Sequence, residues 1–162
     1  MASYDELVPR YRLFMLTYPY SRFRVRDNPV ATLAVGLDQA RVALVTTGGL
    51  LPRGASAFDR TVNGGDVSFR EIGVDADVRE LIEDHKSDAF DHAGVAADRN
   101  LVFPLDRFRE LRDEKRIGSL NDRHLSFMGS IIDPRRLIDE TAPAAARVLK
   151  ADGVDAVFLT PV

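Results

Sequence analysis

The sequence predicts an α/β fold with an open, mostly parallel sheet. The run 41–46 (RVALVT) is almost continuously apolar and is followed by a Gly-Gly pair, which is typical of a strand buried on both faces of a parallel sheet. Near the end of the chain, a helical stretch, a glycine and the apolar run 154–159 follow one another, as in half of a β-α-β unit. Together they indicate a Rossmann-like or flavodoxin-like sheet in one domain over residues 41–162.

Composition and charge narrow the class of protein. Hydrophobic residues make up 45% of the 162 residues and charged residues 29%, so the chain can bury a core. A net charge of -3 argues against nucleic-acid and anionic-membrane partners. The absence of cysteine excludes disulfides, thiolate metal sites and a cysteine nucleophile within the chain. Without a long apolar run or a signal-peptide pattern, we expect a cytoplasmic protein.

Residues 1–40 differ from the rest of the chain. All four tyrosines lie among the first twenty residues, interleaved with arginines and punctuated by Pro9, Pro19 and Pro29. Proline disfavours a long helix, so we interpret this segment as an aromatic, basic arm or short helix. It packs on its own domain or, alternatively, on a partner.

The middle of the chain alternates loops with short elements. We expect a loop over 52–65, a half-exposed strand over 66–72 and a short helix over 75–83. The polar segment 84–94 carries His85 and His92, which we expect to be solvated. A brief extended segment over 99–103 precedes a helix that begins near Pro104 and ends at Gly118.

The last forty residues are more regular. The stretch 124–132 predicts a strand interrupted by Gly129, where a glycine indicates a bulge or the close approach of a ligand or backbone. Thr141 is the expected N-cap of a helix with Pro143 in its first turn, and Gly153 ends that helix. The run 154–159 then predicts another core strand.

Three places could carry chemistry. Ligands of open α/β sheets bind beyond the carboxyl ends of strands, where residues 46–49 (TTGG) offer two hydroxyls and a tight turn; alternatively, the glycines only make the turn. His124 could act as a base or bind a substrate, or it could be structural. His85 and His92 lie among aspartates but match no standard ligand spacing, so we predict no metal site.

Six segments, taken together and in order, resemble the glycine/sarcosine/betaine reductase selenoprotein B family, particularly its D-proline reductase (dithiol) branch. They are 44–50 (LVTTGGL), 65–70 (GDVSFR), 98–107 (DRNLVFPLDR), 117–119 (IGS), 123–129 (RHLSFMG) and 151–162 (ADGVDAVFLTPV). In that family a selenocysteine or cysteine follows the Thr-Pro-Val-like stretch. The resemblance therefore implies that the α/β domain is partial, truncated at a selenocysteine codon read as a stop, with the redox residue after Val162.

The resemblance also implies an activity. A selenolate reductively breaks a C–N bond of an amino-acid-type substrate, a dithiol returns the selenium to its reduced state, and a partner subunit carries a pyruvoyl group. Selenocysteine is then the expected cofactor-like residue of the full-length form, and the 162-residue chain alone is inactive. The residues expected to line the site are Thr46, Thr47, Gly48, Gly49, His124, Ser126, Gly129 and Thr160.

Two other functions stay open at this stage. A non-catalytic binding or regulatory domain would keep the fold and bind a ligand at residues 46–49 without turnover. An unrelated small-molecule enzyme would use His124, or a metal held by His85 and His92.

Overall fold

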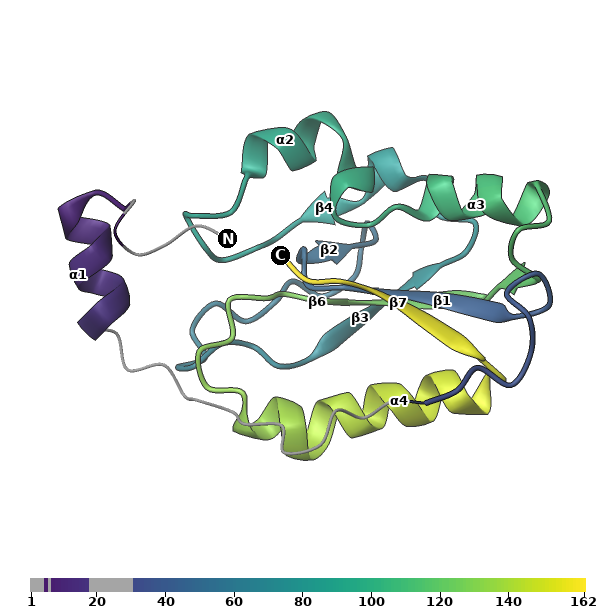
Figure 1. The fold of residues 1–162 in the computed structure, drawn as a ribbon. Helices are drawn as coiled ribbons and strands as arrows, with labels where there is room; N and C mark the ends of the chain where they lie inside the picture. Colours follow the sequence, from purple (N-terminus) through teal and green to yellow (C-terminus); the bar gives the residue numbers. More distant parts are fainter. Residues whose placement is uncertain (1–4, 6, 18–30) are drawn as a thin grey trace.

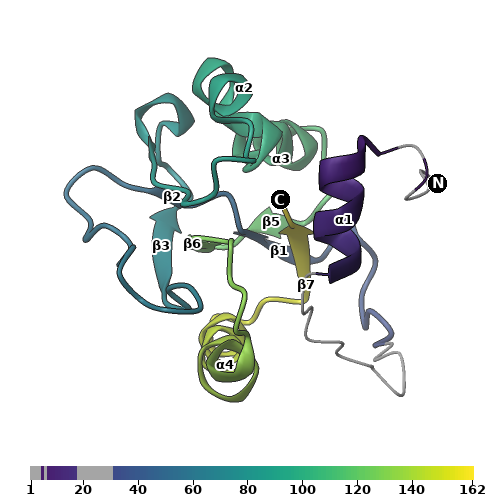
Figure 2. The ribbon, with the colours of Figure 1, turned by 90° about the vertical axis from the view of Figure 1, so that its left-hand side faces the viewer.

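The computed structural model describes residue 5 and residues 7–17 and 31–162, and a five-stranded mixed sheet forms its middle layer, with helices on both faces (Figure 1 and Figure 2). The strands are β1 (Arg41–Thr46), β2 (Leu50–Leu51), β3 (Phe69–Gly73), β4 (Ile82–Glu83), β5 (Ser119–Leu120), β6 (Arg123–Phe127) and β7 (Ala156–Thr160). The α-helices are α1 (Pro9–Thr17), α2 (His92–Ala97), α3 (Leu105–Asp113) and α4 (Ala142–Ala151).

The sheet is mostly parallel, as predicted. β1 is its central strand and pairs in parallel with β5, β6 and β7. β3, within the stretch predicted as a half-exposed strand, pairs with β6 in the antiparallel direction, while β2 and β4 form a separate two-stranded ribbon. The chain passes from β6 through α4 to β7, and β1 lies between these two strands. The Rossmann-like or flavodoxin-like arrangement in particular remains a prediction.

Alternation along β1 divides the core into two layers. Val42 and Leu44 face a large apolar cluster under α3, whereas Ala43 and its neighbour Leu125 face α4, where they meet Leu149. Figure 2 shows α2 and α3 on one side of the sheet and α4 on the other. Burial on both faces explains why β1 is a continuous apolar run.

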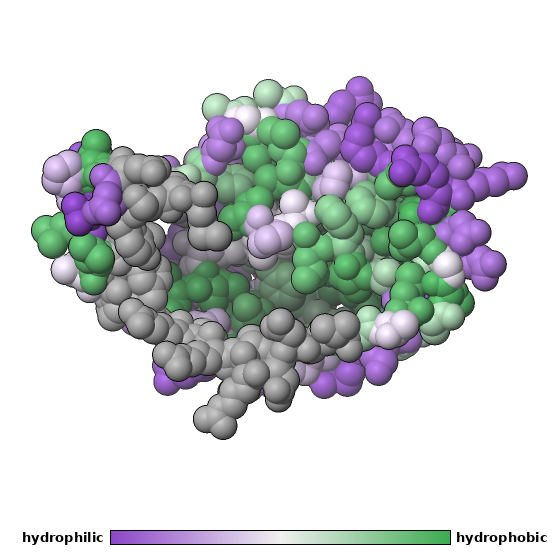
Figure 3. Space-filling model, viewed as in Figure 1, coloured by the Kyte–Doolittle hydropathy of each residue, from purple (hydrophilic) through white to green (hydrophobic). Residues whose placement is uncertain are grey.

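β7 is not the core strand that its sequence suggests. It pairs with β1 and with no other strand of the described part of the chain, so it forms an edge. The side chains of Val157, Phe158 and Leu159 are 42–64% exposed. Figure 3 shows apolar residues gathered between the two helical layers, where β7 runs in Figure 1. An apolar run therefore identified the strand but not its position in the sheet.

Several local predictions were wrong. Residues 75–83 form one 3-10 turn (Val78–Glu80), held by the Asp77 side chain accepting from the Arg79 N–H, and then β4. Residues 99–101, expected to be extended, are a second 3-10 turn capped by Asp98. In both places an aspartate two residues before a backbone N–H supplies a local hydrogen bond that competes with a regular helix or strand.

The helix ends were predicted in part. α3 ends at Asp113 rather than at Gly118, and Lys115 adopts the left-handed conformation with φ of 58°. Gly118 is instead required by the close approach of the Gln39 backbone. Thr141 does precede α4, which follows a π-helical turn (Leu137–Thr141), but its hydroxyl makes no capping bond. Gly153, with φ of 75°, ends α4 as predicted.

The arm predicted for residues 1–40 lies partly outside the described residues, which omit 1–4, 6 and 18–30. Within it, α1 is a nine-residue helix whose Tyr11, Leu13 and Leu16 are half or more exposed. Across the described ranges, no helix is long and apolar enough to cross a membrane.

Candidate functional site

Three parallel strands end side by side and bring three hydroxyl groups into one row. Thr46 of β1 is in register with Ser126 of β6 and with Thr160 of β7. Partners in register point to the same face, which here is the face covered by α2 and α3. Figure 2 looks onto this end of the sheet, where the C-terminus also lies. The sequence-predicted residues Thr46, Ser126 and Thr160 are thus brought together.

Two of the predicted threonines hold the edge in place. The buried Thr46 hydroxyl donates to the carbonyl of Val102 (2.6 Å) and accepts from the N–H of Gly48 (3.0 Å). The Thr47 hydroxyl accepts from the N–H of Val162 (2.9 Å) and donates to its carbonyl (3.2 Å). Thr46 therefore fixes the turn after β1, and Thr47 fixes the segment after β7.

Ser126 and Thr160 are different, because their hydroxyl oxygens are buried and have no hydrogen-bond partner among the described residues. A buried hydroxyl left without a partner costs about 1–3 kcal/mol. Native proteins usually satisfy such groups with water or a ligand. These two hydroxyls flank the occupied Thr46, so the row offers two free positions at the ends of β6 and β7.

His124 lies deeper than this row. Its Nδ1 accepts the N–H of Leu44 (3.1 Å) and its ring meets the ring of Phe103 edge-on, with 5.8 Å between centroids. Burial, assisted by the positive charge of Arg109, lowers the pKa of His124 to about 4. The neutral ring therefore carries its proton on Nε2 and ties β6 to β1.

His85 was expected to be solvated, and this prediction was wrong. His85 is only 4% exposed, and its ring stacks on Phe90 with 4.1 Å between centroids. Nδ1 accepts the N–H of Ser87 (3.2 Å), so the proton of the neutral ring is on Nε2. Nε2 is buried without a partner among the described residues. Burial also lowers the pKa of His85, which keeps the ring neutral.

Two glycines of the predicted site enclose His85. A Cβ on Gly49, whose φ is 66°, would lie 2.8 Å from the backbone nitrogen of His85. A Cβ on Gly129, whose φ is 69°, would lie 2.7 Å from the His85 Nε2 and 2.5 Å from the Thr47 carbonyl oxygen. The sequence predicted a close approach at Gly129 and a tight turn at Gly49, but no local pattern identified His85 as the approaching residue.

The short ribbon explains how His85 reaches this position. Leu50 of β2 is in register with Glu83 of β4, and the N–H of Asp84 donates to the Gly49 carbonyl (2.9 Å). The Glu83 carboxylate then accepts from the His85 N–H with one oxygen and bonds the His92 Nδ1 with the other (2.8 Å). This bond raises the pKa of His92. In the part of the chain that the structure describes, no three potential ligands converge on a metal position.

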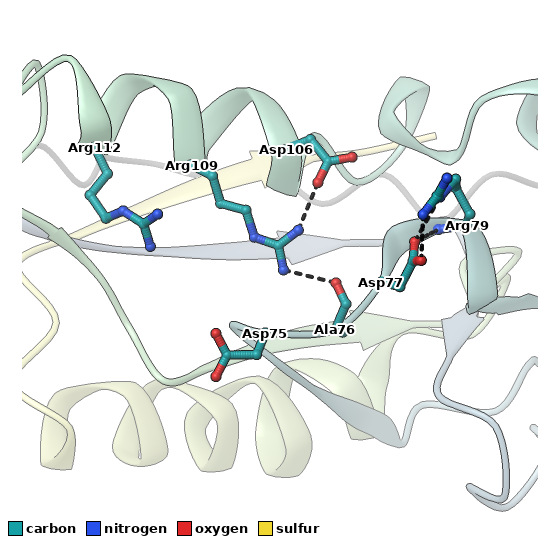
Figure 4. A pocket seen from close by; sticks show the side chains of 7 residues that line it. All are labelled: Asp75, Ala76, Asp77, Arg79, Asp106, Arg109 and Arg112. Carbon is teal, nitrogen blue, oxygen red and sulfur yellow. Dashed lines mark hydrogen bonds and ion pairs between the residues drawn. The ribbon is translucent and has the colours of Figure 1, made fainter.

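A second hollow lies between α3 and the 75–79 turn (Figure 4). Its polar groups largely satisfy one another: Arg109 bonds Asp106 (2.7 Å) and the carbonyl of Ala76 (2.8 Å), and Arg79 pairs with Asp77 (2.8 Å). It therefore offers a ligand fewer free groups than the edge of the sheet does.

An α/β domain with unsatisfied polar groups at the carboxyl ends of parallel strands is typical of a protein that binds a small molecule there. Residues 14–162 match the family described as glycine/sarcosine/betaine reductase selenoprotein B. The chain belongs to this family. The match contains the whole row of hydroxyls, His85 and both enclosing glycines.

Individual relatives carry the names of reductase subunits. The chain is 39% identical over 124 residues to the D-proline reductase subunit gamma of Acetoanaerobium sticklandii, covering 76% of this chain and 49% of that one. It is 34% identical to a glycine reductase complex component B subunit gamma of Carboxydothermus hydrogenoformans, covering 85% and 31%. A sarcosine reductase complex component B subunit beta of Peptoclostridium acidaminophilum is 30% identical, with 91% and 33% covered.

The chain thus spans about half the length of the D-proline reductase subunit and about a third of the other two. No solved structure matches the chain.

Proposed function

We propose that this chain is the substrate-binding α/β part of a reductase subunit of the D-proline reductase type, which cleaves a C–N bond of a small amino acid reductively. The family match over residues 14–162 carries this proposal, because it includes the whole edge at which β1, β6 and β7 end. The relative at 39% identity favours D-proline over glycine, sarcosine or betaine as the substrate.

The strand ends of β1, β6 and β7 contain no group that could supply the electrons for reducing the C–N bond. The 162 residues contain no cysteine, so the redox residue is a selenocysteine or cysteine in another part of the subunit, which we place after Val162 as the resemblance implies. A selenolate would be the nucleophile there, by the same logic as a thiolate. In the net reaction the dithiol becomes a disulfide and supplies two electrons and two protons. The Cα–N bond of D-proline is replaced by a C–H bond and an N–H bond, so the ring opens and the nitrogen stays in the product as an amine.

A partner subunit belongs to this proposal. The relatives named glycine, sarcosine and betaine reductase are components of complexes. The exposed apolar side chains of β7 support a partner or a further strand at that edge. A pyruvoyl group on the partner would activate the substrate amine, while the row of hydroxyls in this chain orients the substrate.

The test is to purify the protein from its host with everything attached to it and to measure dithiol-dependent loss of D-proline, together with the selenium content. We expect the purified protein to turn over D-proline. We also expect it to contain selenium, or its coding DNA to carry a cysteine codon after Val162. Binding of D-proline without turnover in the intact complex would instead support the non-catalytic alternative.

A further inference from the structure

Among the residues that the structure describes, His85 is a buried polar residue beside the strand ends whose position the sequence did not predict, and its Nε2 has no partner. We infer that the Nε2–H of His85 is a binding donor for the carboxylate of a small ligand at this edge. The inference rests on the proposed function only in taking that carboxylate to belong to an amino-acid substrate.

The first support is the fixed tautomer. Because Nδ1 accepts the Ser87 N–H, Nε2 carries the proton of the neutral ring and must donate, and a flip of the ring would lose the bond to Ser87. Nε2 lies beside Gly129, two residues past the end of β6, where Ser126 also lacks a partner. A donor held this way is preorganised for an anionic oxygen, and hydrogen bonds to charged groups are the strong ones.

The second support is the backbone on either side. Gly49 lets the His85 backbone approach the turn after β1, and the missing side chain of Gly129 lets that backbone pack directly against the His85 Nε2. Two separate segments thus place a glycine at positive φ against His85, Gly49 against its backbone and Gly129 against its ring. Packing alone would be served by an apolar side chain at residue 85, which would leave no buried donor without a partner.

The His85 Nε2 is buried and Gly129 lies directly beside it, so the turn that contains Gly129 must move for a ligand to enter. Ser130 has a φ of 48°, an unusual conformation for a residue other than glycine. Residues in such conformations cluster at active sites, ligand clamps and switch regions. We therefore infer that displacement of the 129–130 turn places the ligand carboxylate against His85.

The test is a nuclear magnetic resonance titration of the full 162-residue chain with labelled histidine rings. The probes are D-proline, cyclopentanecarboxylate, which has the carboxylate without the amine, and pyrrolidine, which has the amine without the carboxylate. The His85 Nε2–H signal is expected to move with the two carboxylates and not with pyrrolidine. An unmoved signal with both carboxylates would overturn the inference.

Variants separate a donor from a packing residue. His85→Phe keeps an aromatic ring on Phe90 and is expected to weaken carboxylate binding roughly 10–100-fold, as for the loss of a hydrogen bond to a charged group. His85→Gln, which retains a donor, should recover part of the affinity. The matched control is Asp88→Asn at an exposed position of the same segment, which should bind as the wild type does. Equal affinity of His85→Phe and the wild type would refute a donor role.

The outcomes also separate this inference from the proposed function. If D-proline binds with full affinity to His85→Phe, the inference fails while the proposed function stands. If cyclopentanecarboxylate binds through His85 but D-proline does not bind, the carboxylate site stands and the proposed substrate is wrong.

Discussion

Acidification should destabilise this protein through His124. The His124 ring is fully buried, and its Nδ1 holds the N–H of Leu44 in the central strand. Its pKa is about 4 in the folded protein, against the ordinary histidine value of 6.5. A histidine whose folded pKa is depressed binds its proton in the unfolded state first, so stability falls as the pH falls from the unfolded toward the folded value.

The size of the effect follows from the two pKa values. Between about pH 7.5 and about pH 4.5, proton linkage at this one ring removes on the order of 2–3 kcal/mol from the free energy of unfolding. His85, whose pKa burial also lowers, adds to the loss. His92 opposes it, because the pKa raised by Glu83 gives stability that is present at low pH and lost as the pH rises.

Urea unfolding followed by circular dichroism at both pH values measures this effect. His124→Asn is the matched variant, because an Asn Oδ1 can accept the Leu44 N–H without titrating. We expect the variant to be less stable at neutral pH and to lose about 2 kcal/mol less on acidification than the wild type loses. Equal losses in the two proteins would refute the assignment of this pH dependence to His124.

Three further predictions concern the core and the edge. Leu44→Ala should lower the free energy of unfolding by about 2–5 kcal/mol, since Leu44 is completely buried in the larger core cluster. Ser126→Ala removes a buried hydroxyl without a partner, so it should leave the free energy of unfolding unchanged or raise it by up to about 1 kcal/mol. The same variant should weaken D-proline binding. A clear loss of stability in denaturant unfolding would show that the hydroxyl is satisfied. Asp152→Asn should lower the melting temperature, because Asp152 accepts from Asn121 (3.0 Å) and twice from Arg123 (2.7 Å) at the other end of the sheet; an unchanged melting temperature would contradict the importance of this cluster.

Burial and hydrogen bonding decided which parts of the fold the sequence could predict. β1 and the helix before Gly153 were predicted because an apolar run and a helix with a terminal glycine are local patterns. The exposed position of β7 was not predicted, because the sequence of an apolar strand is similar at the centre and at the edge of a sheet. The 3-10 turns at 78–80 and 99–101 are each capped by a single aspartate side chain. The spacing of apolar residues does not reveal such a hydrogen bond.

The candidate site divides in the same way. Its threonines and glycines could be predicted because parallel strands must end together. His85 could not, since the residue lies in a polar segment and becomes buried only when β4 pairs with β2 and brings it against Gly49 and Gly129.

The most direct test of the central claim is a crystal structure of the chain with D-proline. We predict that the ligand lies at the carboxyl ends of β1, β6 and β7, with its oxygens within hydrogen-bond distance of Ser126, Thr160 or His85. D-proline in the hollow lined by Arg109 and Asp75, with the strand ends unchanged, would contradict the claim.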